Sequence, residues 1–339
     1  MNRFTPIPLV VLWSSGFVGA TLASRSAPAE TTLLWRYVVA VVPLVGWALW
    51  TRRRYGARFL VREGVIGILA QGGYCLGVYR AADMGVLPGT SALVASLQPP
   101  LVAAVLWAGS GGRTDRRQAL GLVTGMAGVL LVVGGDLGGA GGTAGLTAVG
   151  LGTLSLTAAT LVAGRWAEPP GHGVMDSLAV QSVMALGSFA AVALATGTAA
   201  PPRDGDFWLA IAWLVVLPAF GGYGTYYYVL RTSGPVAVSA WLYLTPAVAA
   251  LWAWPMFGEP LTVRAAVGFL IAAAGVAAVV RAKRPVSHSS TRGPQRRGDP
   301  AGCAAAGATA GTRSRSGRET RPDERARRRP DPAGPARRW

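Results

Sequence analysis

Residues 77–107 read GVYRAADMGVLPGTSALVASLQPPLVAAVLW, and residues 224–254 read GTYYYVLRTSGPVAVSAWLYLTPAVAALWAW. At a constant offset of 147 residues, the alignment of the two regions needs no gap from residue 77 to residue 133. The identical pairs include Gly77 with Gly224, Tyr79 with Tyr226, Pro88 with Pro235, Pro99 with Pro246, Trp107 with Trp254, Gly111 with Gly258, Arg117 with Arg264, Gly121 with Gly268, and Gly128 with Gly275. Apolar composition gives chance matches of Ala and Val, whereas this set indicates an internal duplication.

The composition is typical of a membrane protein. Of the 339 residues, 51% are hydrophobic and only 14% are charged, and the mean hydropathy is +0.38. Soluble domains carry about 25% charged residues, which excludes an ordinary soluble enzyme. The net charge of +17 is uneven, because residues 1–280 carry +6 and residues 281–339 carry +11. We therefore expect an apolar membrane body followed by a basic tail.

Charged residues divide this body into ten nearly uncharged runs. The runs cover about 4–24, 33–51, 64–79, 84–112, 118–135, 137–164, 177–202, 207–230, 232–258 and 265–280. Each meets or approaches the roughly 20 apolar residues that a spanning helix needs. Strands of a membrane barrel would alternate polar and apolar residues, and stretches such as 209–216 and 123–133 do not. The sequence thus predicts an all-α integral membrane protein with ten transmembrane helices.

The first run has a second interpretation. Arg3, the apolar stretch after it and the small residues at 27–29 resemble a cleavable signal peptide. Residues 13–16, WSSG, interrupt the stretch, and nine more runs follow. We interpret the run as the first span.

The duplication and the ten runs together predict two units of five helices. An odd number of spans per unit turns the second unit upside down relative to the first, and inverted repeats are typical of transporters with a substrate site near the midplane. The alternative is a duplicated membrane scaffold without transport activity. Basic residues number 14 on one side of this topology and four on the other. The positive-inside rule then places both termini in the cytoplasm.

Several motifs resemble one family. They are WSSGFV at 13–18, Arg36, ADMGVLPGTSAL at 82–93, LQPP at 97–100, GPVA at 234–237, LTPA at 244–247 and GEPLT at 258–262, followed by Gly268 and Gly275. Over about residues 5–283 the chain resembles EamA-type transporters of the drug/metabolite transporter superfamily. The resemblance implies two five-helix repeats at 1–137 and 145–283, before a disordered basic tail at 284–339. It also implies an inner-membrane protein that moves small metabolites, often amino acids or related compounds, frequently outward. The first half departs from the pattern, with Gly112 where the second half has Glu259.

Polar and aromatic side chains within the runs are candidates for substrate binding, because polar groups are costly inside a membrane. The candidates are Trp13, Ser14, Arg36, Gln71, Tyr74, Gln98, Tyr223, Trp241 and Tyr243. Arg36 has three interpretations: it binds a substrate carboxylate, it reaches the outer interface, or it pairs with Asp83. The amides either bind substrate or join helices, and the aromatic residues either line a cavity or anchor the protein at the membrane surface.

Two prolines and two sets of small residues predict features of the helices. Pro99 and Pro246 occupy equivalent positions and predict helix kinks, because proline removes a backbone donor. Small residues at four-residue spacing lie at 121, 125 and 128 and at 268, 272 and 275. Such residues let helices approach closely, either between the two halves or between the protomers of a homodimer.

The sequence offers little to catalysis or metal binding. Two cysteines, Cys75 and Cys303, and two histidines, His172 and His288, make a metal centre improbable, and no hydrolase, zincin or phosphate-loop motif occurs. We expect no enzyme activity and no cofactor. No carboxylate lies near the middle of a predicted span, which favours transport that is not driven by protons.

The expected partners are a small-molecule substrate and membrane lipid. Arg325 and residues 327–329 in the tail are suited to anionic lipid, and we expect no specific nucleic-acid binding. A lipid flippase built on the same helices is the alternative function.

Overall fold

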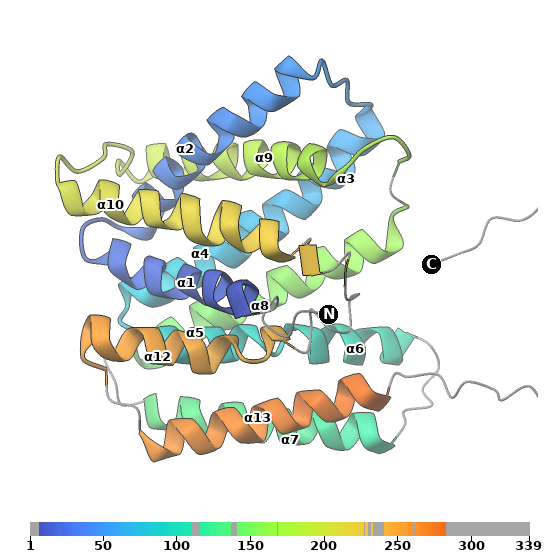
Figure 1. Ribbon diagram of the computed structural model, residues 1–339, viewed down its shortest axis with the longest axis vertical. Coiled ribbons are helices and arrows are strands. Elements are labelled where there is room, and N and C mark those ends of the chain that lie inside the picture. Colours follow the sequence, from blue (N-terminus) through green and yellow to red (C-terminus); the bar gives the residue numbers. More distant parts are fainter. Residues whose placement is uncertain are drawn as a thin grey trace, which may run out of the picture. The chain divides into compact units, whose positions relative to one another are not determined.

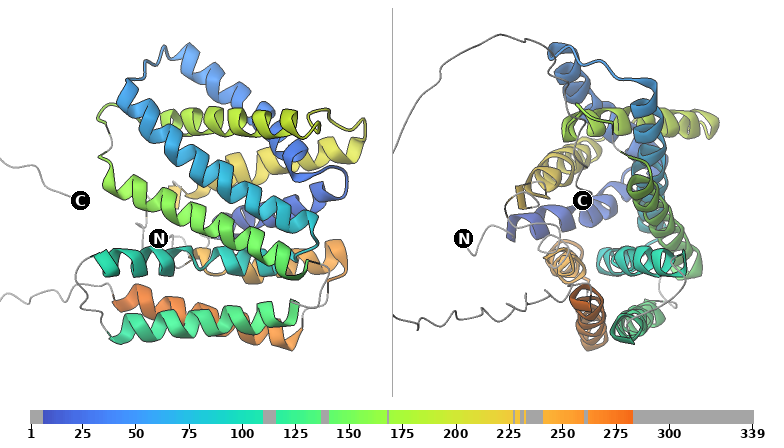
Figure 2. Two further views of the ribbon diagram at one scale, coloured as in Figure 1. Left: turned by 180° about the vertical axis from the view of Figure 1, so that it is seen from behind. Right: turned by 90° about the vertical axis from the view of Figure 1, so that its right-hand side faces the viewer.

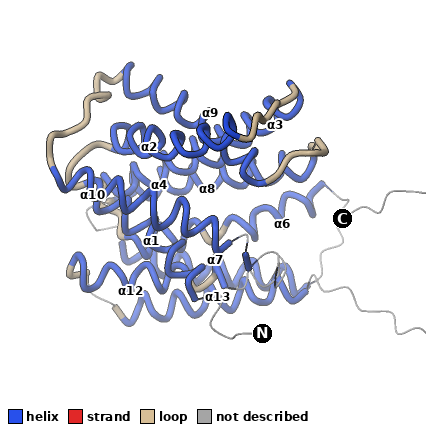
Figure 3. The backbone as a smooth tube through the Cα atoms, turned by 45° about the horizontal axis from the view of Figure 1, so that its top comes forward, coloured by secondary structure: helices blue, strands red, loops and turns tan. Residues whose placement is uncertain are grey.

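The computed structural model describes residues 7–109, 116–136, 141–167, 169–226, 228–229, 232, 241–259 and 262–282. All of these residues belong to one compact unit within residues 1–286. The basic tail predicted at 284–339 therefore lies outside the described residues. Every regular element in the described part of the chain is helical, and no strand occurs there (Figure 3).

The first half contains eight helical segments. They are α1 (Ile7–Ser24), α2 (Ala29–Trp50), α3 (Ala57–Gly67), the π-helix η1 (Ile68–Gly73), α4 (Tyr74–Asp83), α5 (Pro88–Ala95), α6 (Gln98–Gly109) and α7 (Arg116–Asp136). The second half contains, within the described residues, α8 (Gly142–Arg165), α9 (Val174–Ala195), α10 (Gly205–Leu214), the π-helix η2 (Val215–Gly222), α12 (Thr245–Phe257) and α13 (Val263–Ala282). Because α3, η1 and α4 follow one another without a break, they form one continuous helical stretch.

The helix bounds follow the offset of 147 residues found in the sequence. The first residues of η1, α6 and α7, shifted by 147, are the first residues of η2, α12 and α13. The same shift places α3 within one residue of α10 and α2 within two residues of α9. The correspondence thus extends to helices before residue 77, where the sequence alone gives no alignment.

Six stretches of the described residues are long and apolar enough to cross a membrane. They are Ile7–Ser24, Ala29–Trp50, Pro88–Leu106, Gly142–Arg165, Val174–Ala195 and Gly205–Tyr226. Two shorter apolar stretches, Val123–Val132 and Val263–Gly275, lie in α7 and α13.

Helices α7 and α13 lie side by side along their lengths (Figures 1 and 2). A Cβ atom added to Gly128 would lie 2.4 Å from the backbone nitrogen of Ala272, and one added to Gly275 would lie 2.2 Å from that of Gly125. The glycines thus permit backbone contact between two helices of one chain. The sequence allows these small residues to pack either between the two halves or between protomers. In the structure they pack between the two halves.

The predicted kinks are helix boundaries. Pro99 and Pro246 are each the second residue of a helix, α6 and α12, where proline is tolerated because the first turn has unpaired N–H groups anyway. Pro99 also lies within the apolar stretch Pro88–Leu106, which continues across the turn at 96–97, and the two breaks occupy equivalent positions in the two halves.

Candidate functional site

A cavity of about 540 Å³, called here the central cavity, opens among helices of both halves. It is lined from the first half by α1, α4, α5, α6 and η1, and from the second half by α8, α9 and residues 223, 226, 242, 243 and 245. Five predicted substrate-binding residues line it, namely Trp13, Tyr74, Gln98, Tyr223 and Tyr243. Its volume lies within the roughly 300–1,000 Å³ usual for small-molecule sites.

The wall of the central cavity carries polar atoms of two kinds. The hydroxyls of Tyr243 and Thr245 are buried and have no hydrogen-bond partner. The Gln98 side chain instead donates from Nε2 to Thr160 Oγ1 at 2.7 Å, joining α6 to α8. A buried hydroxyl without a partner costs about 1–3 kcal/mol, which makes these two groups candidates for ligand binding.

A smaller cavity of about 80 Å³, called here the arginine pocket, adjoins the first. Arg36 lines it together with Tyr37, Cys75 and Tyr79. Trp13, Phe17, Ala70, Tyr74 and Tyr223 line both the arginine pocket and the central cavity. A ligand that fills both spaces therefore meets one shared wall.

Arg36 is held by neutral groups. Its Nη1 donates to the Tyr79 hydroxyl at 2.7 Å and lies 3.9 Å from Cys75 Sγ. Its guanidinium carbon lies 5.4 Å from the ring centroid of Tyr37 and 5.6 Å from that of Tyr79, within cation–π range. No carboxylate of the described residues forms an ion pair with it.

The predicted alternative of a pair between Arg36 and Asp83 is wrong. Asp83 Oδ2 accepts a hydrogen bond from the Ala29 backbone N–H at 2.7 Å, and Glu30 pairs with Arg80. Asp83 thus supplies a carboxylate to the N-terminus of α2, where the helix dipole favours negative charge. Desolvation raises the pKa of the Asp83 carboxyl to about 6, although the hydrogen bond from Ala29 acts in the opposite direction.

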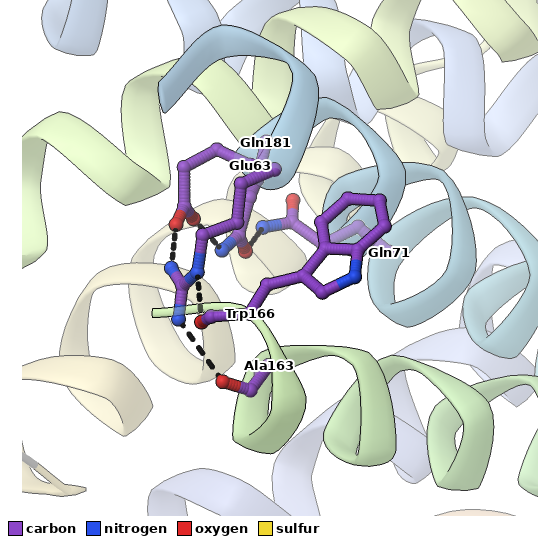
Figure 4. Close-up of polar contacts among 6 residues, drawn as sticks. Glu63, Gln71, Ala163, Trp166 and Gln181 are labelled. Atoms are coloured by element: carbon purple, nitrogen blue, oxygen red, sulfur yellow. Dashed lines mark hydrogen bonds and ion pairs between the residues drawn. The ribbon is translucent and has the colours of Figure 1, made fainter. Parts of the chain in front are cut away.

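A chain of side-chain contacts runs from the region of the cavities to one end of the helices (Figure 4). Gln71 donates from Nε2 to Gln181 Oε1 at 3.1 Å, and Gln181 donates from Nε2 to Glu63 Oε2 at 2.7 Å. Glu63 also pairs with Arg62, while Ser182 donates to Gln71. Gln181 lines the central cavity, and Gln71 lines a small pocket that also contains Arg36. These side-chain contacts link α3 and η1 to α9.

The Arg62 end of this chain also holds α8. Arg62 donates from Nε to the Trp166 carbonyl at 3.0 Å and from Nη2 to the Ala163 carbonyl at 3.2 Å. These carbonyls lie at the C-terminal end of α8, where a cation is favoured by the helix dipole. The Glu63 residue is only 1% exposed. Arg62 and Glu63 therefore form a buried junction of three helices.

Sequence reasoning missed Glu63. Because charged residues limit the apolar runs, the sequence predicts a third span that begins at residue 64. In the structure, α3 begins earlier, at Ala57. Glu63 lies inside this helix, although not at the middle of the continuous stretch. The amides of Gln71 and Gln181 are the sequence feature related to the burial of Glu63, since Gln181 accepts a hydrogen bond from Gln71 and donates one to Glu63. The two amides become partners only in the folded chain.

The remaining candidates have other roles. Ser14 is fully buried, and its Oγ donates to the Val11 carbonyl at 3.0 Å in its own helix. Trp241 packs against the cluster of Leu9 and Val229. Ser14 thus forms a local hydrogen bond, and Trp241 contributes to packing.

The comparisons with known proteins agree with these features. A family model described as the EamA-like transporter family matches residues 7–134 and 145–281, the two halves separated above. These helices and the cavity among them are those of a multi-pass membrane transporter. The chain belongs to the EamA-like transporter family.

One solved structure supports the fold alone. Described only as "Crystal structure of protein", it is 18% identical, with a TM-score of 0.56, over 83% of this chain and 98% of that chain. No curated protein matches the chain at a significant level.

Proposed function

We propose that the protein moves small metabolites of amino-acid size across the inner membrane by alternating access, in the outward direction. The observation that carries this proposal is the central cavity, because its wall comes from both matched halves and presents two buried hydroxyls without partners. The proposed architecture has ten spans in two inverted five-helix repeats, with both termini in the cytoplasm. Family membership supports transport, and the equal helix bounds of the two halves support the repeats.

The junction of Arg62 and Glu63 suits a gate in this scheme. It ties α3 of the first half to α8 and α9 of the second, and the positive-inside rule places this end at the cytoplasm. Opening the cavity toward the cytoplasm would require these contacts to separate. The structure would then correspond to a state closed at that end.

Counterflow in proteoliposomes tests the proposal. Vesicles containing the full chain are loaded with a pooled mixture of amino acids and small metabolites, and uptake of labelled members is measured. We expect selective exchange of one compound class. Exchange of no soluble compound by folded protein would contradict the proposal, and movement of labelled lipid in the same vesicles would establish the flippase alternative.

Tyr243→Phe is the sharpest variant for locating the site. It removes an unpaired hydroxyl, so we expect weaker substrate binding by about tenfold with no loss of thermal stability. Gln98→Ala tests the opposite wall, and Ser188→Ala on α9 is the matched control, because the Ser188 hydroxyl only donates to a carbonyl of its own helix. Unchanged exchange in both Tyr243→Phe and Gln98→Ala would place the site elsewhere.

Transport without proton coupling remains part of the proposal. Glu63, which contacts the cavity-lining Gln181, is paired with Arg62, and no acidic side chain of the described residues lines the central cavity or the arginine pocket. We expect flux that does not change with an imposed proton gradient. Substrate accumulation driven by that gradient would contradict this part of the proposal alone.

A further inference from the structure

The charge of the two cavities is carried by one side chain. Among the described residues that line the arginine pocket and the central cavity, Arg36 is the sole charged one. The guanidinium stays protonated in proteins, and its five N–H groups exceed what Tyr79 and Cys75 accept. Burying such a cation against neutral groups is costly unless an anion joins it. The pocket is thus incomplete without an anionic ligand.

The shape of the site separates a small charged end from a larger apolar one. The arginine pocket, at about 80 Å³, is the smaller space and accommodates a carboxylate beside Arg36, whereas the central cavity of about 540 Å³ accommodates a ring or a branched chain. The shared wall is aromatic, since the rings of Trp13 and Tyr223 lie 5.5 Å apart in an edge-to-face arrangement. A flat apolar body packs favourably against such rings.

The site provides no ionic partner for an ammonium group. No acidic side chain of the described residues lines either cavity. The rings of Tyr37 and Tyr79 already face the Arg36 guanidinium, and a second cation nearby would be repelled by it. The ammonium group of a zwitterion would therefore exchange its hydration for neutral hydroxyls, amides and rings, with no carboxylate to pair with it.

We propose that the substrate class is a small organic monocarboxylate with an aromatic or branched apolar body and no ammonium group, its carboxylate bound by Arg36. This inference rests on the proposed function and narrows it, because it separates organic acids from amino acids of equal size.

Four phenyl compounds test the inference on the unaltered protein. Phenylacetate is the anion, phenylacetamide its neutral analogue, phenylalanine the zwitterion and phenethylamine the cation. Binding to the purified full chain is measured by calorimetry, and each compound is also tested in counterflow. We expect phenylacetate to bind on the order of tenfold to a hundredfold more tightly than the other three, the scale of charge-assisted hydrogen bonds. Equal or tighter binding of phenylalanine, or no binding of phenylacetate, would overturn the inference.

Variants at residue 36 test whether Arg36 binds the carboxylate of phenylacetate. Arg36→Gln is expected to reduce phenylacetate binding at least about tenfold while phenylacetamide binding stays the same, and Arg36→Lys should restore part of the loss. An equal loss for both compounds would overturn the assignment of the carboxylate to Arg36. The two proposals fail separately: exchange of amino acids but not of phenylacetate contradicts only the substrate class, whereas tight binding of phenylacetate without any exchange contradicts only transport.

Discussion

The two halves of the molecule begin several helices at equivalent residues but differ in their charged side chains. At the offset of 147, residues Arg36, Arg62, Glu63 and Gln71 correspond to Val183, Leu209, Ala210 and Pro218. The charged groups of the arginine pocket and of the junction on α3 thus belong to one copy, and the second half supplies the amide of Gln181. The close glycine contacts of α7 and α13 draw on both halves. At these sites the backbone packing is symmetric, whereas the charges are specific to the first half.

The largest expected effect comes from breaking the polar junction. Glu63→Ala leaves Arg62 without its carboxylate partner, and we expect a loss of about 3–5 kcal/mol in the free energy of unfolding. The double variant Arg62→Leu with Glu63→Ala copies Leu209 and Ala210 of the second half. It should recover at least half of that loss, because no unpaired charge is then buried.

Unfolding of the two variants in detergent, followed by circular dichroism, measures the difference. If the double variant is as unstable as Glu63→Ala, the junction acts through packing rather than through charge.

The glycine seam should respond equally in both halves. Gly128→Ala and Gly275→Ala are equivalent changes, and each places a Cβ atom against the backbone of the facing helix. We expect each to cost about 1–3 kcal/mol. Gly187→Ala on α9 is the control, since nothing lies within 4 Å of the Cβ it adds. Thermal denaturation in one detergent compares all three, and a clearly unequal cost at 128 and 275 would refute the symmetry of the packing.

A smaller effect is expected at Asp83, whose equivalent in the second half is Leu230. Its pKa of about 6 is above the ordinary value of 3.8, so the folded chain holds the proton more tightly than the unfolded chain. The resulting stabilisation is complete below about pH 3.8 and is lost as the pH rises through 6.

Relative to Asp83→Asn, the protein should therefore gain stability between pH 7 and pH 4, by less than about 1 kcal/mol because the carboxyl is only partly desolvated and solvent screens it. Parallel melting curves across this range measure the gain. A relative stability that falls on acidification would contradict the assignment.

The smallest effect is expected from removing residues 284–339. Because both matched family regions end before this segment, the chain without it should transport at the same rate and melt at the same temperature. Counterflow and melting of the shortened chain provide the test. A loss of transport with unchanged melting would assign a function to the tail.

The sequence predicts the helices well where the signal is local. Apolar runs and the matched glycines and prolines predicted the positions of α6, α7, α12 and α13, because these elements depend on composition and spacing. Of the residues predicted to bind substrate, Trp13, Tyr74 and Tyr243 line the central cavity, whereas Ser14 and Trp241 do not.

The sequence did not predict interactions between residues that lie far apart along the chain. Glu63 is acceptable inside the protein because Gln181, more than a hundred residues away, donates to it. Arg36 had three interpretations in the sequence, and only the position of Tyr79 relative to α2 decides against Asp83. Charges inside a membrane protein are therefore the least predictable residues, since their neutralisation is a property of the folded chain.

The positions of the two π-helices indicate whether the extra residue was inserted before or after the duplication. A π-helical turn arises when one extra residue is accommodated within an α-helix, and such turns often occur at functional sites. Segments η1 and η2 begin 147 residues apart, at the same place in each half. One insertion in a single-copy ancestor accounts for both, whereas later insertions would have to coincide. The simplest order of events therefore places the widened turn before the duplication.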